Sequence, residues 1–158
     1  MYSKSFEVRW SDLDANWHLA NSAYTNFMSH TRMSYFYDNG FTPLAMKEAG
    51  IGPVVFYEHM YYFREVLPGP PIRVTLELKG LSKDGMFFEF LHNFYDFTGK
   101  HKAQCEMMGG WIDMKARKLC SLQGDLLEAT MAVEKAEDFR WLTREDTRKF
   151  ARRPKDLE

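Results

Sequence analysis

The sequence has few of the features that mark a secreted, membrane-spanning or nucleic-acid-binding protein. Only two of its 158 residues are cysteines, Cys105 and Cys120, and they make neither a disulfide framework nor a zinc site. Positive and negative side chains nearly balance, 21 against 22, so the charge gives no argument for nucleic acid as a partner. The longest stretch without a formal charge, 15–31, contains three Asn and two His and is too polar to span a membrane.

Internal repeats, low-complexity segments and linkers are also absent, and the length suits one domain with a sizeable core. The segment "MYSKSFEV" contains no apolar run of signal-peptide length, so we expect a cytoplasmic protein. Asp12, Asp14 and His18 lie close together in the sequence, but metal sites usually need further ligands. We therefore expect neither a metal nor a cofactor.

Aromatic side chains are what the sequence has in abundance. They make up 16% of the residues, with 13 Phe, 8 Tyr and 4 Trp. So many wide, flat side chains indicate a large packed sheet face, a subunit interface or an apolar pocket. Cys105 lies in the strand-like segment "KAQCEMM" and is expected to be a buried thiol.

A long helix with little charge is predicted over residues 21–37. Tyr24 and Tyr35 belong to an apolar stripe at helical spacing, and Arg32 is the only formal charge in the segment. Because apolar side chains also spread beyond this stripe, the helix is expected to be mostly buried, with His30 as an interior histidine.

Period-two alternation predicts strands on both sides of this helix. The segment 4–11 precedes the helix, and "SKDG" at 82–85 is a hairpin turn in the meander that follows it. The four strands of the meander are predicted at 53–65, 72–80, 86–97 and 102–114. Gly109 and Gly110, in the last of them, indicate a bend or a close approach by another backbone.

These elements predict an α+β domain in which an antiparallel sheet wraps around one apolar helix. Because a single helix cannot cover such a sheet, we expect at least a dimer, with two subunits joined edge to edge. Two further helices are predicted at 124–136 and 143–153, the second with Thr143 and Asp146 as a capping pair.

The segment "WSDLDANWHLANSAYTNF" places Asp14, Asn16 and His18 at alternating positions just before the long helix. One interpretation is structural: an aspartate closes an Asx turn, Asn21 or Ser22 caps the helix, and the histidine is an ordinary loop residue. The other is an active site, because a helix start offers unpaired N–H groups and favours negative charge. Such donors can stabilise an oxyanion while an aspartate activates water or attacks directly, as acyl transfer requires.

The same segment resembles the hotdog-fold acyl thioesterases. Its Asp-x-Asp pair, followed by a loop and Asn-x-x-Tyr, is similar to the 4-hydroxybenzoyl-CoA thioesterase type and its YbgC-like relatives. The spacing Asp14-x-Asn16-x-His18 is closer still to plant-type acyl-ACP thioesterases. The resemblance continues through "YFREVLPGPPIRVTLEL" and "GGWIDMKARKLCSL" and covers roughly residues 4–122.

This resemblance implies a hotdog fold, in which the long helix lies inside the wrapped sheet, and a homodimer or homotetramer as the working unit. Residues 1–122 would form the hotdog thioesterase domain, and 123–158 a helical extension of the same domain. The implied activity is hydrolysis of acyl thioesters, with acyl-CoA or acyl-carrier protein as the substrate.

The resemblance also implies roles for single residues. Asp14 would be the general base or the nucleophile, and the backbone N–H of Asn21 would polarise the thioester carbonyl. Asn16 and His18 would position water or substrate.

Three further residues are expected on the substrate side. Tyr24 would pack in the pocket, and Trp17 would either narrow the pocket or cover the loop. Arg64 is a candidate for the phosphates of CoA.

Two other functions fit the same fold. A non-catalytic acyl-binding protein is one, although it would not need Asp14. A hotdog dehydratase or hydratase is the other, but the "HFPG"-like motif of such relatives is absent. Some hotdog thioesterases carry a catalytic Glu within the helix, whereas residues 21–37 contain neither Glu nor Asp. Asp14 must therefore perform any such chemistry here.

Overall fold

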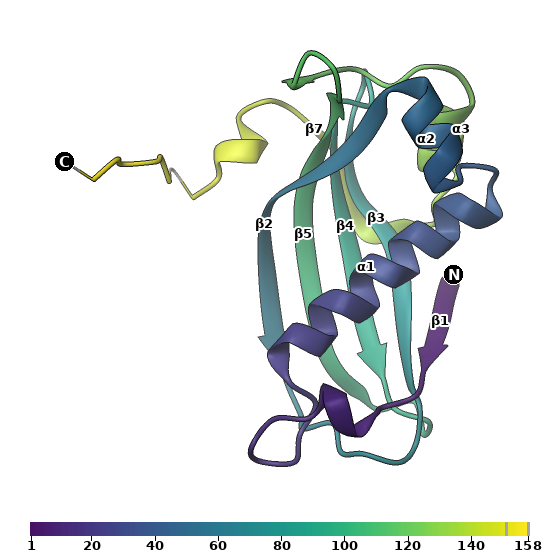
Figure 1. Cartoon of the computed structure of the whole chain (residues 1–158), viewed down its shortest axis with the longest axis vertical. Coiled ribbons are helices and arrows are strands. Elements are labelled where there is room, and N and C mark those ends of the chain that lie inside the picture. The colour runs from purple at the N-terminus through teal and green to yellow at the C-terminus, as the bar shows by residue number, and fades with distance from the viewer. Residues whose placement is uncertain (151, 158) are drawn as a thin grey trace.

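A curved sheet wraps around one long helix in the computed structural model, which describes residues 1–150 and 152–157 (Figure 1). The strands follow the order β1-β3-β4-β5-β2, with β6 pairing with β5 and β7 with β3. The elements are β1 (Tyr2–Phe6), α1 (Asn21–Asp38), α2 (Pro43–Ala49), β2 (Ile51–Tyr62), β3 (Ile72–Ser82), β4 (Phe87–Tyr95), β5 (His101–Asp113), β6 (Lys118–Leu119), α3 (Gly124–Met131) and β7 (Lys135–Leu142), with 3-10 turns at Trp10–Asp12 and Asp146–Arg148.

Helix α1 packs one side of its surface against the concave face of the sheet (Figure 1). The side chains buried on that side are Ala23, Tyr24, Phe27, Met28, Thr31, Tyr35 and Phe36. The opposite side is exposed, so the prediction of a mostly buried helix is wrong there. His30 is exposed rather than interior, and its ring packs edge-on against Phe6 at 5.6 Å.

The sheet contributes a floor of large aromatic side chains beneath the helix. Trp111, Phe88, Phe90 and Phe94 are almost fully buried. Phe36 of α1 contacts this floor, with its ring centroid 5.6 Å from that of Trp111. The aromatic content of the sequence therefore forms a packed sheet face. The thiol of Cys105 is also buried and free.

Gly109 marks a close approach between β5 and its neighbours, as the paired glycines predict. A Cβ atom at Gly109 would lie 2.5 Å from the carbonyl oxygen of Val54 and 2.5 Å from the ring of Phe88. Opposite this position, the pairing of β2 with β5 shifts by one residue between Val55 and Tyr57. Only a residue without a side chain fits between this irregularity and the ring below.

We expect Gly109→Ala to lower the free energy of unfolding by about 1–3 kcal/mol, because the added methyl group collides with backbone as well as with Phe88. Chemical denaturation measures this loss. Gly52→Ala is the matched control in β2, since a Cβ there meets only Met114 atoms at 3.5 Å. Equal stability of the two variants would contradict the packing described for Gly109.

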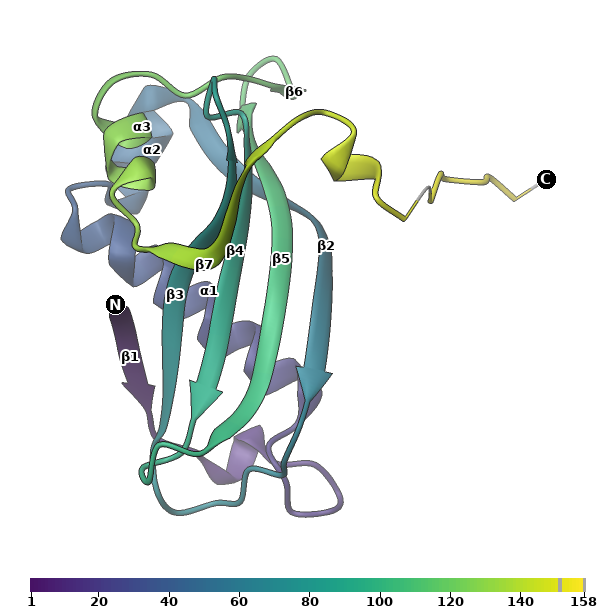
Figure 2. The ribbon, with the colours of Figure 1, turned by 180° about the vertical axis from the view of Figure 1, so that it is seen from behind.

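The C-terminal part differs from the sequence prediction. Helix α3 ends at Met131, and the following residues form β7, which runs parallel to β3 (Figure 2). The helix predicted at 143–153 is reduced to the 3-10 turn, and residue 151 lies outside the described residues. The predicted pair does form, because the backbone N–H and the hydroxyl group of Thr143 donate to the Asp146 carboxylate at 2.7 and 3.0 Å. It is followed only by the 3-10 turn and not by a longer helix.

The first strand is also shorter and earlier than predicted. β1 pairs with β3 from Tyr2 to Phe6, whereas Trp10 begins a 3-10 turn and is exposed. The prediction of a strand over 4–11 is therefore correct only at its start. The alternation of Phe6, Val8 and Trp10 extends beyond the residues that find a partner strand.

A polar pair, made of buried His92 and half-buried Arg32, connects α1 to the sheet. His92, with no exposed surface, donates from Nδ1 to the Thr75 carbonyl at 2.7 Å. This bond leaves Nε2 to accept from Nη1 of Arg32 at 3.2 Å. Burial, and next the charge of Arg32, lower the pKa of His92 from its ordinary 6.5 to about 3.

The neutral state of His92 predicts a pH dependence of stability. Below the ordinary pKa of 6.5, His92 takes up a proton in the unfolded chain but not in the folded one. As the pH decreases below 6.5, this residue alone should therefore lower the free energy of unfolding by up to about 1.4 kcal/mol for each pH unit. His92→Gln should remove this part of the slope in urea unfolding measured between pH 7 and pH 4. Identical slopes for the two proteins would show that His92 is not the cause.

Candidate functional site

The loop before α1 folds into a turn around the carboxylate of Asp14. Its Oδ1 accepts hydrogen bonds from the backbone N–H groups of Asn16 at 2.8 Å and His18 at 3.2 Å. The Asp14 N–H in turn donates to the carbonyl of His18 at 2.8 Å. Asp14 therefore closes an Asx turn, as the structural interpretation of the sequence predicts. These bonds also orient its carboxylate.

Backbone hydrogen bonds attach this loop to the rest of the protein. Leu19 donates to the carbonyl of Val66 at 2.8 Å, which ties the loop to the connection between β2 and β3. Ala20 donates to the carbonyl of Asp12 at 2.8 Å, while the Asp12 carboxylate accepts from Arg9 N at 2.9 Å. Asp12 therefore closes the 3-10 turn and holds the loop together.

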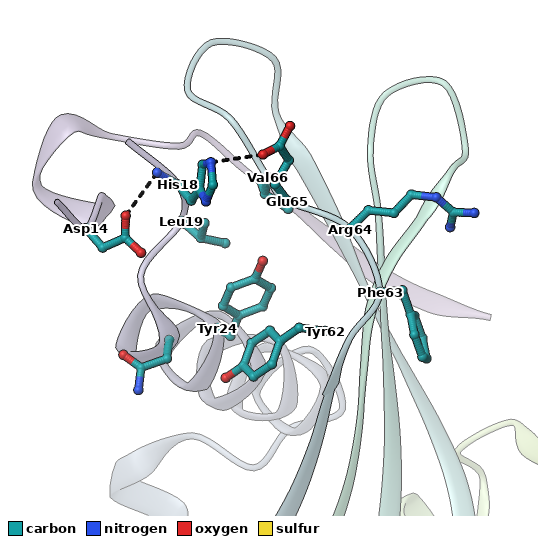
Figure 3. Close-up of a pocket in the computed structure, with 10 residues that line it drawn as sticks. Asp14, His18, Leu19, Tyr24, Tyr62, Phe63, Arg64, Glu65 and Val66 are labelled. Atoms are coloured by element: carbon teal, nitrogen blue, oxygen red, sulfur yellow. Dashed lines mark hydrogen bonds and ion pairs between the residues drawn. The ribbon is translucent and has the colours of Figure 1, made fainter. Parts of the chain in front are cut away.

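A cavity of about 370 Å³ lies where this loop, the start of α1 and the end of β2 meet (Figure 3). Its lining residues are Asp14, His18, Leu19, Asn21, Tyr24, Tyr62, Phe63, Arg64, Glu65 and Val66. The structure thus gathers residues from two segments separated by about forty positions in the sequence.

The start of α1 borders this cavity without a capping side chain. The N-cap residue is Ala20, which offers no side-chain acceptor to the first turn. Asn21, the first helical residue, lies in the cavity wall. Such a helix end presents backbone N–H donors and a partial positive charge, which together favour a negatively charged or strongly polarised oxygen.

Tyr24 forms the inner wall of the cavity. Its ring is buried and lies edge-on to Tyr62 at 5.1 Å and to Phe94 at 5.0 Å. The pKa of Tyr24 is raised to about 12. Burial is the largest cause, followed by the neighbouring Tyr62 and the negative charge of Asp14. The phenol is therefore neutral, and it gives the cavity an apolar side with one polar atom.

His18 is held by a residue that the sequence analysis did not single out. Its Nε2 lies 2.9 Å from Oε2 of Glu65, which comes from the segment after β2 and lies beside it (Figure 3). Glu65 follows the end of β2 by three residues, and no spacing in the sequence relates it to His18. Only the loop connection through Val66 brings the two side chains together.

A family model described as the thioesterase-like superfamily matches residues 8–130. The chain belongs to the thioesterase-like superfamily. No curated protein sequence matches it.

Solved structures similar to this superfamily member share its fold. A 1,4-dihydroxy-2-naphthoyl-CoA thioesterase from Synechocystis is 12% identical, with a TM-score of 0.74 over 83% of this chain and 96% of that one. The Escherichia coli protein YbaW is 23% identical, with a TM-score of 0.72 over 85% and 100%. A Staphylococcus aureus protein in complex with CoA is 15% identical, with a TM-score of 0.77 over 99% and 95%. The predicted α+β hotdog fold is confirmed.

Two of the predicted site residues lie outside the cavity. Asn16 is exposed and is not among the lining residues. Trp17 adopts a left-handed conformation, with φ of 64°, and is 61% exposed. Its ring packs edge-on against Trp10 at 5.5 Å, so it covers the loop and does not narrow the pocket.

Arg64 lies at the rim of the cavity. Its Nη1 donates to the carbonyl of His101 at 2.7 Å, and its side chain points away from Asp14 and Tyr24 (Figure 3).

The described residues contain no cluster of three or more metal-ligating side chains. Among the helices of residues 1–150 and 152–157, none combines the length and hydropathy needed to cross a membrane.

Proposed function

We propose that this protein hydrolyses acyl thioesters in the cavity at the start of α1, with Asp14 as the catalytic carboxylate. The observation that carries the proposal is that Asp14 and the uncapped first residue of α1, Asn21, line the same cavity. Membership of the thioesterase-like superfamily supports thioester hydrolysis as the general activity.

The proposed reaction begins with the thioester carbonyl oxygen against the backbone N–H of Asn21. Negative charge grows on this oxygen as the carbonyl carbon is attacked, and the N–H group and helix dipole stabilise it. Oδ1 of Asp14 is occupied by two backbone donors, so Oδ2 is the oxygen directed at the reaction. It either takes a proton from the attacking water or attacks the carbonyl carbon itself to form a mixed anhydride, and in both cases the C–S bond breaks and the thiolate leaves. Water then hydrolyses the anhydride, which releases the acid and regenerates the Asp14 carboxylate.

The other polar residues would position the reactants. Glu65 holds the ring of His18 at the cavity, where the imidazole can hydrogen-bond water or substrate. The aromatic wall of Tyr24 and Tyr62 would receive the first part of the acyl group.

CoA is the proposed thiol portion of the substrate. The rim position of Arg64 suits a phosphate, since a guanidinium forms two parallel hydrogen bonds to such a group. A structurally similar protein from Staphylococcus aureus was solved with CoA, which supports this choice.

Asp14→Asn should reduce thiol release from acyl-CoA by about 10²–10⁴-fold, because the amide can neither accept the proton nor attack. A thiol reagent and a panel of aliphatic and aromatic acyl-CoAs measure the rate. Asp12→Asn is the matched control, since Asp12 lies outside the cavity and the amide oxygen of Asn can still accept from Arg9 N, which keeps the loop in place. This variant should keep kcat within about twofold of wild type.

The outcomes separate the candidate functions. Turnover that depends on Asp14 but not on Asp12 supports the proposed enzyme. Wild-type protein that binds acyl-CoA without turnover would favour the non-catalytic acyl-binding alternative. Equal turnover by wild type and Asp14→Asn would remove Asp14 from the chemistry.

We also propose that the protein works as a dimer through β2, the edge strand of the sheet. This strand is twelve residues long and exposes large apolar side chains, which an edge strand in a monomer avoids. The exposed side chains of this kind are Val55, Phe56, Tyr61 and Tyr62. Light scattering should give at least twice the chain mass of 18.6 kDa, and a monomer at micromolar concentration would contradict the proposal.

A further inference from the structure

Aromatic side chains line up along β2 on the convex face of the sheet, which is the face away from α1. Met60 packs against the core and the ring of Tyr62 contacts Tyr24 of α1, so the even-numbered side chains of this part of β2 face the helix. Because side chains alternate along a strand, the odd-numbered ones face the other side. They form an aromatic row of Tyr57, His59, Tyr61 and Phe63. Successive ring centroids along this row are 6.0, 6.3 and 6.4 Å apart.

The C-terminal part of the chain covers the first half of the aromatic row. After β7 it crosses the convex face, and the ring of Phe150 lies 5.0 Å from that of Tyr57 and 4.2 Å from that of His59 (Figure 2). The second half of the row is open, since Tyr61 is 45% exposed and Phe63 is 50% exposed. Adjacent exposed rings at the edge of a sheet are typical of a surface that a partner covers.

The chain leaves the subunit after Phe150 instead of continuing along the row. Figures 1 and 2 both show segment 152–157 extending past β2 and away from the sheet. All six residues of the segment are exposed, and Leu157 is 99% exposed. The segment therefore contributes no packing to its own subunit.

Segment 152–157 is long enough to reach a second sheet. Leu157 lies seven residues after Phe150, so the extended chain between them spans up to about 24 Å. Paired strands lie only about 4.8 Å apart, and β2 is the edge that we propose pairs with the partner. Pro154 favours extended backbone at Arg153, the residue before it. The segment thus suits an arm that crosses the edge of one subunit onto the next.

The side chains of the segment complement exposed aromatic rings. The guanidinium groups of Arg152 and Arg153 can stack on ring faces, and Leu157 offers an apolar contact. The protein already contains a contact of this kind, because the guanidinium carbon of Arg73 lies 5.9 Å from the ring centroid of Tyr95.

We propose that residues 152–157 of one subunit pack on Tyr61 and Phe63 of the partner subunit, so that the two chains exchange C-terminal segments across paired β2 strands. This inference rests on the proposed dimer through β2. In each subunit the first half of the aromatic row is covered by its own Phe150, and the second half by the partner's segment. The exchange adds contacts on both convex faces to the pairing of the strand edges, and it makes the dimer tighter.

The first test measures the dissociation constant of the dimer by sedimentation of the full-length chain over a dilution series. A segment variant with Arg152→Gln, Arg153→Gln and Leu157→Ser should raise this constant by at least about tenfold, because a symmetric dimer loses the contact twice. Phe63→Ser should raise it by a similar factor. Combining both sets of changes should add little, since each removes the same contact.

Arg148→Gln and Phe97→Ser are the matched controls. Arg148 is exposed but precedes Phe150, and Phe97 is 70% exposed in the turn between β4 and β5. Both variants should keep the dissociation constant within about twofold of wild type. A dimer that stays equally tight in the segment variant would overturn the inference, and so would effects of the segment variant and Phe63→Ser that simply add.

Disulfide trapping determines which chain the segment contacts. Gln104 pairs with Tyr61 in the neighbouring strand β5, so it lies beside the open half of the row. In a Cys120→Ser background, where the remaining Cys105 is buried, one chain carries Leu157→Cys and the other Gln104→Cys. Oxidised glutathione should join the mixed chains into a disulfide-linked heterodimer. In a chain that carries both cysteines, a disulfide within the monomer would show that the segment folds onto its own row, which would overturn the inference.

These readouts do not depend on turnover, so they separate the exchange from the other proposals. A tight dimer that is insensitive to the segment overturns the exchange and keeps the proposed dimer through β2. A monomeric wild type overturns both. A chain that is inactive on every acyl-CoA but forms the heterodimeric disulfide overturns the proposed catalysis and supports the exchange.

Discussion

Burial of one side of α1 against the concave face of the sheet is the contact on which the rest of the structure depends. Phe36 and its neighbours on that side meet a floor of aromatic rings from β4 and β5. Removing this much apolar surface from water holds the helix at a fixed height and angle. The position of the helix start, and with it the geometry of the candidate site, follows from this packing.

The site uses a feature that an ordinary helix would avoid. The N-cap residue, Ala20, leaves the first turn of α1 without a side-chain acceptor, and the preceding loop directs its carboxylate, Asp14, into the adjoining cavity. A capping side chain would satisfy the same N–H groups that a substrate oxygen is proposed to use. Hydrogen bonds within and around the loop hold it in place without a helix cap. They are made by the Asp12 carboxylate and by the N–H of Leu19, which donates to the carbonyl of Val66.

Buried polar groups divide into two kinds in this protein. His92 has a donor and an acceptor for its two ring nitrogens, so it serves to join α1 to the sheet. Trp111 is fully buried, and its indole N–H has no hydrogen-bond partner among the described residues. His92 therefore contributes to the fold through its polar atoms, whereas Trp111 contributes through the packing of its ring.

Local patterns in the sequence determined the long helix, the meander of strands, the Asp-Gly hairpin turn and the segment around Asp14. Each of these depends on neighbours within a few positions, so periodicity and turn chemistry are enough to find it. Local patterns do not predict strand β7, because only its pairing with β3 makes this segment a strand. They place β1 too late in the sequence, because its ends depend on pairing with the same strand.

Tertiary structure alone decided the contact between His18 and Glu65, the exposure of Trp17 and the hydrogen bond between Arg32 and His92. They arise where segments far apart in the sequence come into contact, and the spacing of residues along the chain cannot predict such contacts.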